Sequence, residues 1–203
     1  MAVRVSQSDP GTAARILDIA ERLVQVRGFN GFSYADVAAE LGISKAALHY
    51  HFAGKADLGE ALISRYTSNF AEALASVDAT AADAPARLAG YADLYLQVLR
   101  NEKMCLCGML AAEYQTLPQP MREAVMRFFD QNEGWLEGVL EQGRTDGVLQ
   151  FAGPGRTTAR LIIGSLEGAM LIARPYGDDA RFQATVDSLL GGLIRPAAAA
   201  TVA

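Results

Sequence analysis

Cysteine and histidine are scarce in this chain of 203 residues, which contains two of each. Two cysteines are too few for a disulfide-stabilised scaffold, so we expect free thiols in a reducing compartment. Long apolar runs are also missing. The N-terminus lacks the apolar core of a signal peptide, and the most apolar stretch, 161–173, is too short to span a membrane and contains Glu167. We therefore expect a cytoplasmic protein without a membrane partner.

A strong net charge is absent as well. The formal charge is -5, which argues against a protein that coats nucleic acid without selectivity. Residues 1–66 hold seven basic and seven acidic side chains, whereas 67–203 hold eleven basic and sixteen acidic ones. No carboxylate occurs in 41–56, which contains Lys45 and Lys55. The N-terminal part is therefore neutral overall and contains a locally positive segment.

Neither strand-like alternation nor an internal repeat occurs, and apolar residues recur with helical spacing instead. At 51% hydrophobic residues the chain can bury a sizeable core. The spacing predicts an all-α fold with helices over 12–27, 55–77, 86–103, 121–143, 157–174 and 178–193, and a shorter helix before Thr116. Two domains follow from this pattern. We expect a three-helix helix-turn-helix domain over 1–54, a helical effector-binding and dimerisation domain over 55–195, and a fraying tail over 196–203.

The segment 33–55 carries two short helical patterns joined by a glycine turn. Ser33 with Asp36 three residues later is close to a capping box, in which the hydroxyl can accept hydrogen bonds from amides of the first turn. Gly42 stands where a helix favours a left-handed terminator, and Ser44 can cap the next helix. Two helices joined by so few residues must cross steeply, which indicates a helix-turn-helix.

The second helix of this pair has an apolar inner face and a polar outer face. Leu48 and Phe52 share the inner face at i and i+4. Small residues flanked by hydrogen-bond donors suit a DNA groove. On the outer face these are Ala46, Ala47, His49 and Tyr50, with Lys45 and His51 on the flanks. A helical hairpin inside another kind of all-α domain would explain the apolar spacing but not this outer face.

The region 12–62 resembles the DNA-binding domain of the TetR family of bacterial repressors. The resemblance rests on a helix ending R-G-F, the turn V-A-x-x-L-G-I-S-K, the run A-x-L-x-x-H-F, and Lys55 three positions after the phenylalanine. It implies contacts of Tyr50 and Lys55 with phosphates, whereas His49, where many members carry tyrosine, would face base edges with Lys45, Ala46 and Ala47. The full set of expected DNA-binding residues is Ser33, Tyr34, Ser44, Lys45, Ala46, Ala47, His49, Tyr50, His51 and Lys55.

Two small residues, Gly164 and Gly168, lie four apart on the predicted helix 157–174 and would let another helix approach closely. The family resemblance implies that the last two helices of each subunit form a four-helix bundle, so we expect a homodimer interface that also includes Leu161 and Leu189. Packing against helices of the same chain is the alternative for these glycines. A twofold dimer would place two recognition helices about one DNA turn or more apart, which calls for a palindromic operator.

Aromatic and methionine side chains crowd the middle of the sequence, and such side chains suit an adaptable apolar pocket. The residues expected to contact a small-molecule effector are Tyr66, Phe70, Tyr95, Met104, Cys105, Met109 and Trp135. Ordinary core packing is the alternative for most of them.

The run 103–118 resembles the sensor helix of a TetR subgroup that includes the repressor of N-ethylmaleimide reductase. On that pattern Cys105 matches the electrophile-sensing cysteine and Glu113 an acidic position, while Cys107 departs from it. A helix N-terminus and Lys103 would favour the Cys105 thiolate. Burial as small hydrophobic side chains is the alternative for both thiols. No metal site is expected, because the C-x-C pair has no further Cys or His cluster to complete it.

These patterns predict a homodimeric TetR-like repressor that binds a palindromic operator in double-stranded DNA and is released by a small molecule or an electrophile. We expect neither a cofactor nor enzymatic activity, because no nucleophile, base and orienting group occur together and no phosphate-binding glycine loop is present. Two alternatives stay open. One is an enzyme built on a helical bundle, and the other is a ligand-binding adaptor that uses the module for protein contacts.

Overall fold

The computed structural model describes residues 10–195, and the regular structure in this range is α-helical. The only β-type pairing among the described residues is an isolated bridge between Leu149 and Ile194. The predicted all-α fold class is thereby confirmed. The predicted tail, 196–203, lies outside the described residues.

Two compact units divide the chain. The first comprises Met1–Asn69 and Lys103–Arg127, and the second comprises Phe70–Glu102 and Phe128–Ala203. Two long helices, α4 (Lys55–Thr80) and α7 (Gln119–Thr145), contribute residues to both units. The first unit therefore includes residues beyond 54. The boundary predicted between residues 54 and 55 separates the DNA-binding domain from the rest of the chain, and it stays a prediction.

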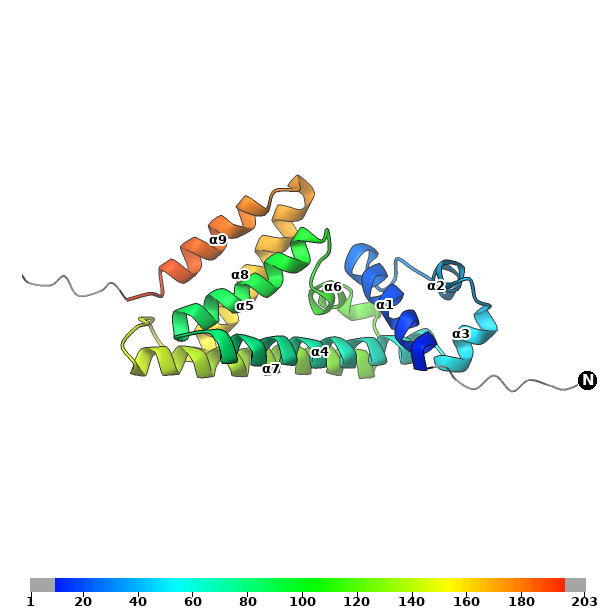
Figure 1. The fold of residues 1–203 in the computed structure, drawn as a ribbon, viewed down its shortest axis with the longest axis horizontal. Helices are drawn as coiled ribbons and strands as arrows, with labels where there is room; N and C mark the ends of the chain where they lie inside the picture. The colour runs from blue at the N-terminus through cyan, green and yellow to red at the C-terminus, as the bar shows by residue number, and fades with distance from the viewer. Residues whose placement is uncertain (1–9, 196–203) are drawn as a thin grey trace, which may run out of the picture. The chain divides into compact units, whose positions relative to one another are not determined.

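The first unit contains α1 (Pro10–Arg27), α2 (Tyr34–Leu41) and α3 (Lys45–His51), drawn from blue to cyan in Figure 1. Helix α1 contacts both α2 and the short helix α6 (Leu106–Ala112), which is followed by the 3-10 helix η1 (Tyr114–Thr116). Apolar side chains of α1, α2, α3 and the turn between α1 and α2 form the core, together with residues of α4. Its buried side chains include Ile16, Ala20, Leu23, Val24, Phe29, Phe32, Val37, Leu48, Leu58 and Leu62.

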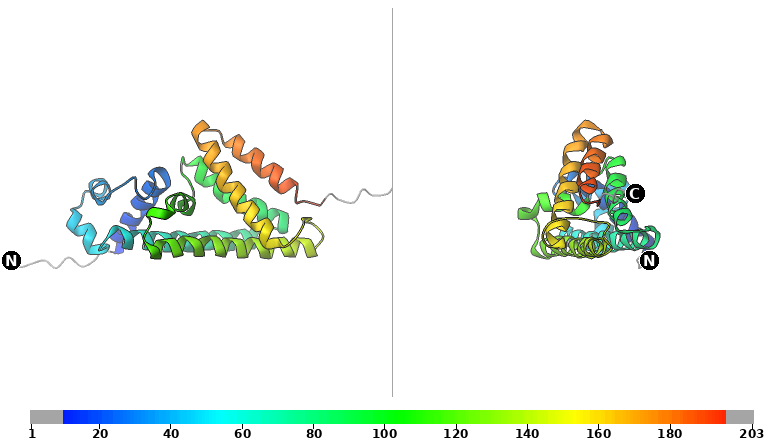
Figure 2. Two further views of the ribbon diagram at one scale, coloured as in Figure 1. Left: turned by 180° about the vertical axis from the view of Figure 1, so that it is seen from behind. Right: turned by 90° about the vertical axis from the view of Figure 1, so that its left-hand side faces the viewer.

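The second unit contains α5 (Ala84–Arg100), α8 (Gly155–Ala173) and α9 (Asp179–Gly191), with the 3-10 helix η2 (Arg174–Tyr176) between the last two. Helices α8 and α9 pack against each other and against α5, as Figures 1 and 2 show. Predicted and observed helix ends differ by a few residues. Pro120 is the second residue of α7, where the missing N–H of proline removes no helical hydrogen bond.

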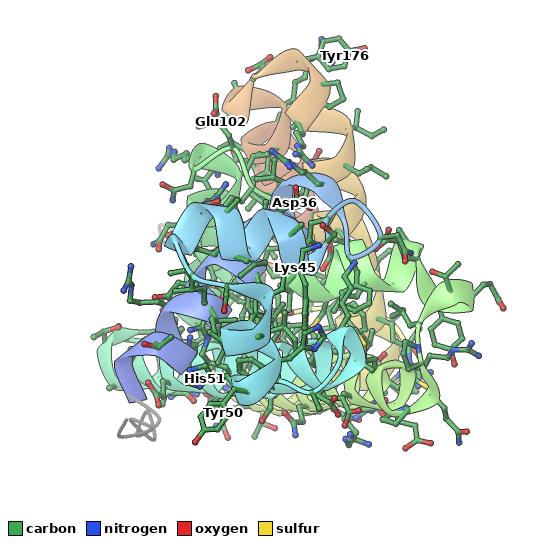
Figure 3. All side chains as sticks on the ribbon, turned by 90° about the vertical axis from the view of Figure 1, so that its right-hand side faces the viewer. Asp36, Lys45, Tyr50, His51, Glu102 and Tyr176 are labelled. Carbon is green, nitrogen blue, oxygen red and sulfur yellow. The ribbon has the colours of Figure 1, made fainter. Side chains whose placement is uncertain are left out.

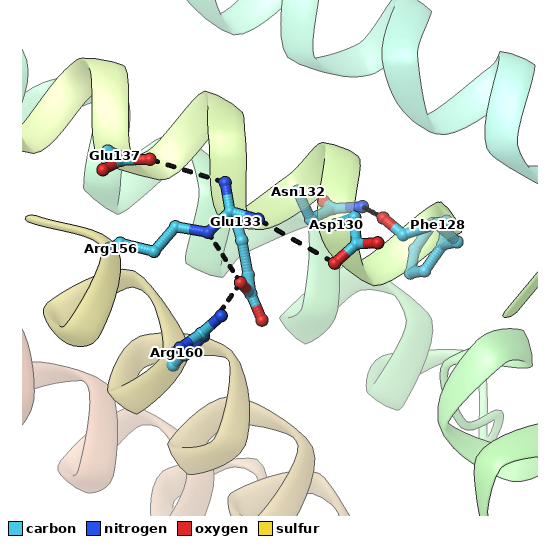
Figure 4. Close-up of polar contacts among 7 residues, drawn as sticks. All are labelled: Phe128, Asp130, Asn132, Glu133, Glu137, Arg156 and Arg160. Atoms are coloured by element: carbon cyan, nitrogen blue, oxygen red, sulfur yellow. Dashed lines mark hydrogen bonds and ion pairs between the residues drawn. The ribbon is translucent and has the colours of Figure 1, made fainter. Parts of the chain in front are cut away.

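Charged side chains join α7 to α8 in the second unit (Figure 4). The Arg156 guanidinium donates to Glu133 at 2.8 Å and to Glu137 at 3.4 Å, and Arg160 donates to the same Glu133 carboxylate at 3.0 Å. Asp130 lies 3.8 Å from Arg156. Because Glu133 is shared by two arginines and its side chain is only 16% exposed, this network fixes how α8 lies along α7 better than an isolated surface pair would.

Gly143 of α7 packs closely against Leu149 and Ala84. A Cβ there would lie 2.4 Å from Leu149 Cδ1 and 2.7 Å from Ala84 Cβ, so Gly143→Ala should lower the free energy of unfolding by about 1–3 kcal/mol through overpacking. Gly138, on the same helix, has no atom within 4 Å of such a Cβ. Gly138→Ala should therefore raise the free energy of unfolding by about 0.5–1 kcal/mol. Urea unfolding measures both variants, and equal effects would contradict this packing.

Candidate nucleic-acid interface

The turn between α2 and α3 has the local geometry predicted from its sequence. Gly42 ends α2 in the left-handed region with φ +67°, and its N–H donates to the carbonyl of Ala39 at 3.3 Å. Ser44 is the N-cap of α3, and its hydroxyl accepts from the N–H of Ala47 at 3.1 Å. Leu48 is fully buried. One side of α3 is thus anchored in the core, and this part of the helix-turn-helix prediction is confirmed.

Ser33 is the N-cap of α2 and forms the predicted capping box with Asp36. Its N–H donates to Asp36 Oδ2 at 2.6 Å, and its hydroxyl donates to the same oxygen at 2.7 Å. These two hydrogen bonds, from the hydroxyl first and the N–H second, lower the pKa of the Asp36 carboxyl. Ser33 is exposed, and its polar groups serve the helix start. Its contact with DNA stays a prediction.

The outer face of α3 is open to solvent. Lys45, Ala46, His49 and Tyr50 are exposed, and Tyr50 is 64% exposed. Figure 3 labels Lys45, Tyr50 and His51 on this helix, with Tyr50 extending away from the ribbon. Ala47 and His51 are half-buried, and the ring of His51 lies edge-on to that of Tyr50, with 5.6 Å between the centroids. The outward face predicted from helical spacing is therefore present.

His49 has a defined ring orientation on this face. Its Nδ1 lies 3.0 Å from the carbonyl oxygen of Ala53, and because a carbonyl can only accept, Nδ1 carries the proton. The neutral ring then has Nε2 available as an acceptor, and the protonated ring has it available as a donor. The ring also packs against Tyr34, with 4.8 Å between the centroids. His49 can therefore present a single, fixed polar atom to a ligand.

Tyr34 has an internal role that the sequence did not reveal. Its hydroxyl lies within hydrogen-bonding distance of two carbonyl oxygens, those of Phe52 at 3.0 Å and Gly54 at 2.5 Å. Burial first, and then the negative charge of Asp57, raise the pKa of the Tyr34 hydroxyl to about 12. Tyr34 thus joins α2 to the linker between α3 and α4. Its contact with DNA stays a prediction.

Lys55, the first residue of α4, also makes internal contacts. Its ammonium donates to the carbonyl oxygens of Phe29 and Phe32 and lies over both rings, 4.5 Å and 4.2 Å from their centroids. Burial lowers the pKa of the Lys55 ammonium, and the charges of Glu113 and Asp36 oppose that shift. Sequence spacing alone cannot show these contacts, which join residues 26 and 23 positions apart. Its phosphate contact stays a prediction.

The residues expected to contact an effector are divided between the two units. The first unit contains Tyr66, Met104, Cys105 and Met109, and the second contains Phe70, Tyr95 and Trp135. Cys105 is the N-cap of α6, and its Sγ accepts from the N–H of Gly108 at 3.4 Å and lies 3.8 Å from the Tyr66 hydroxyl. The thiols of Cys105 and Cys107 are both buried. This burial agrees with the alternative to a sensor role, in which both cysteines pack as small hydrophobic side chains.

Aromatic rings form one cluster within the second unit. Phe70 lies edge-on to Tyr91 and Tyr95, and Trp135 stacks on Tyr91 with 5.7 Å between the centroids. The Tyr91 hydroxyl donates to the side-chain oxygen of Asn132 at 3.2 Å, so this apolar cluster contains a buried polar pair. Its composition suits an aromatic ligand as well as a core, and the effector role of these residues stays a prediction.

The expected dimer residues lie on one side of α8 and on α9. Leu161, Gly164 and Gly168 are exposed, and Leu189 is half-buried. Two further apolar residues of α8, Leu171 and Ile172, are 60% and 61% exposed. A helical stripe of apolar side chains and glycines is thus uncovered in the single chain.

Two absences hold for the part of the chain that the structure describes. No group of three or more His, Cys, Asp or Glu residues there is placed to hold a metal ion. None of the helices within 10–195 is both long enough and apolar enough to cross a membrane.

Comparisons with known proteins agree with this architecture. Residues 16–62 match the family described as "Bacterial regulatory proteins, tetR family", and residues 84–189 match "Tetracyclin repressor-like, C-terminal domain". The HTH-type transcriptional repressor NemR of Escherichia coli (strain K12) is 27% identical over 169 residues, which cover 80% of this chain and 84% of NemR.

Two solved structures resemble the whole fold. A TetR-family transcriptional regulator from Agrobacterium tumefaciens is 32% identical with a TM-score of 0.89, and the match covers 92% of this chain and 100% of that one. A TetR transcriptional regulator from Legionella pneumophila is 34% identical with a TM-score of 0.82, covering 93% and 100%. The chain therefore belongs to the TetR family of bacterial regulatory proteins.

Proposed function

We propose that this protein is a homodimeric transcriptional repressor that binds a palindromic operator through α3 and is released by a small-molecule effector. The observation that carries the proposal is the outer face of α3, where Lys45, His49 and Tyr50 are exposed on a helix anchored by the fully buried Leu48. The relatives are transcriptional regulators, so we infer a regulator in preference to an enzyme.

The chemistry of this face supports direct reading of DNA. Lys45 supplies donors for base edges, His49 offers Nε2, and the small side chains of Ala46 and Ala47 permit close approach to the groove. The Tyr50 hydroxyl suits a phosphate oxygen, which would position the helix without selecting a sequence. No carboxylate occurs in 41–56 to repel the phosphates.

An operator-binding titration tests the proposed function. With a DNA fragment from upstream of the gene, Lys45→Ala should weaken binding by about 1–3 kcal/mol and reduce the preference for this fragment over unrelated DNA. Arg127→Ala is the matched control, because it also removes one positive charge from an exposed side chain, at 63% exposure, outside the helix-turn-helix. Equal affinity of both variants and wild type would contradict the role of α3. Absence of any salt-sensitive binding by wild type would favour a ligand-binding adaptor or an enzyme.

The uncovered stripe on α8 supports the proposed dimer. Leu161, Gly164, Gly168, Leu171 and Ile172 follow one another at spacings of three, four, three and one, which keeps them on one side of a helix. A Cβ at either glycine would meet no atom within 4 Å in the single chain, so their small size is not explained by packing inside the chain. A second copy of the same surface would use it.

Dimerisation should be sensitive to side-chain volume on this stripe. Gly168→Leu should weaken the dimer by about 1–3 kcal/mol, because the added side chain enters a close helix contact. Gly138→Leu is the matched control on α7, where a Cβ likewise meets no atom within 4 Å. Sedimentation equilibrium measures both. A Gly168→Leu dimer as strong as the control would place the interface elsewhere.

For the effector, burial of both thiols favours a ligand that binds non-covalently over direct attack by an electrophile. In the native protein, N-ethylmaleimide should therefore label Cys105 and Cys107 slowly, and both should react rapidly after denaturation. Mass spectrometry of labelled peptides follows each thiol separately. Rapid labelling of Cys105 in the native protein, accompanied by loss of operator binding that Cys105→Ser prevents, would instead support an electrophile sensor.

A further inference from the structure

Glu113, the C-cap residue of α6, contacts the turn between α1 and α2 within the first unit. Its two carboxylate oxygens accept from the backbone N–H groups of Phe29 at 2.6 Å and Asn30 at 3.1 Å. The neighbouring Thr116 hydroxyl accepts from the side-chain amide of Asn30 at 2.7 Å. Three hydrogen bonds thus join this turn to a segment more than eighty positions later in the chain.

The Glu113 carboxylate lies where an anion is normally unfavourable, and its hydrogen bonds stabilise it there. Residues 29 and 30 follow the C-terminal end of α1, and a helix C-terminus carries partial negative charge, which disfavours an anion nearby. The contact is therefore favourable only because charge-assisted hydrogen bonds to the two amides offset that repulsion. Gly28 makes the approach possible, since it has φ +82° and a Cβ there would lie 2.9 Å from Glu113 Oε1.

Lys55 contacts the carbonyl groups of the same turn. The Lys55 ammonium donates to the carbonyl oxygens of Phe29 and Phe32, whereas the Glu113 carboxylate accepts from the N–H groups of Phe29 and Asn30. Ser33, the N-cap of α2, follows directly. We call residues 104–116, which include α6, the α6 segment. The start of the helix-turn-helix is thus fixed between the Glu113 carboxylate of the α6 segment and the Lys55 ammonium of α4.

A second contact joins the other end of the α6 segment to α1. The N–H of Met104 donates to the carbonyl oxygen of Gln25, in the last turn of α1, at 3.1 Å. Met104 and Cys105 are among the residues expected to contact an effector, and Glu113 ends the helix that follows them. Displacement of α6 would therefore act on α1 and on the turn after it together.

We propose that Glu113 is a positioning residue for DNA binding, whose carboxylate links the α6 segment to the α1–α2 turn and transmits movement of α6 to the helix-turn-helix. This inference rests on the proposed function, since it assumes that the helix-turn-helix binds an operator. Glu113 itself touches no DNA in this proposal. Loss of its contact frees the turn, so that the helix-turn-helix loses the fixed geometry that operator binding needs.

The test uses the full-length protein and Glu113→Gln, which keeps the side-chain shape but removes the charge. Amide hydrogen exchange of Phe29 and Asn30 should become about tenfold faster, and operator affinity should fall about tenfold, as expected for loss of charge-assisted hydrogen bonds. Exchange in the interior of α4 should not change. Glu123→Gln is the matched control: this carboxylate lies in the same unit, is 53% exposed and accepts from the Gln119 side chain.

The exchange rates and the operator affinity together decide whether Glu113 positions the helix-turn-helix. Unchanged exchange of the two amides together with unchanged operator affinity in Glu113→Gln would overturn the inference and leave the proposed function intact. Faster exchange with unchanged affinity would also overturn it, because the contact would then be structural only. Failure of wild type to bind any upstream fragment would contradict the proposed function and, with it, the positioning role. Glu113→Ala, if it folds, should exceed Glu113→Gln in both effects, and the reverse order would contradict the contact.

Discussion

The turn between α1 and α2 depends on two opposite charges that reach it from distant parts of the sequence. Lys55 donates to its carbonyl groups and Glu113 accepts from its N–H groups. A half-buried ammonium loses part of its hydration, and here two carbonyl oxygens and two aromatic faces replace the lost contacts with water. Because α2 begins at Tyr34, directly after the turn, these contacts fix the backbone from which α2 starts.

The second unit combines polar and close apolar contacts with one uncovered surface. Glu133, shared by Arg156 and Arg160, joins α7 to α8, and Gly143 of α7 packs closely against Leu149 and Ala84. Gly164, Gly168 and the exposed apolar side chains of α8 face solvent in the single chain. In the proposed twofold dimer, this stripe would meet the same stripe of a second copy.

Local features of the fold could be predicted from the sequence because they depend on neighbouring residues. Gly42 ends α2, Ser44 caps α3 and Leu48 faces the core, as short-range rules for helix ends and helical spacing require. Long-range features could not be predicted in this way. The roles of Tyr34 and Glu113 depend on which backbone carbonyls and amides tertiary packing brings to them, and no spacing rule specifies that.

We expect the α1–α2 turn to join α6 and the helix-turn-helix into one cooperative unit. A double-mutant cycle on the free energy of unfolding measures this coupling, with Lys55→Met, Glu113→Gln and the variant carrying both changes. The two losses should not be additive, and their coupling energy should be about 0.5–3 kcal/mol, the range found for residues in one network. Losses that add to within about 0.3 kcal/mol would show that Lys55 and Glu113 act on the turn independently, and the turn would then not couple the two segments.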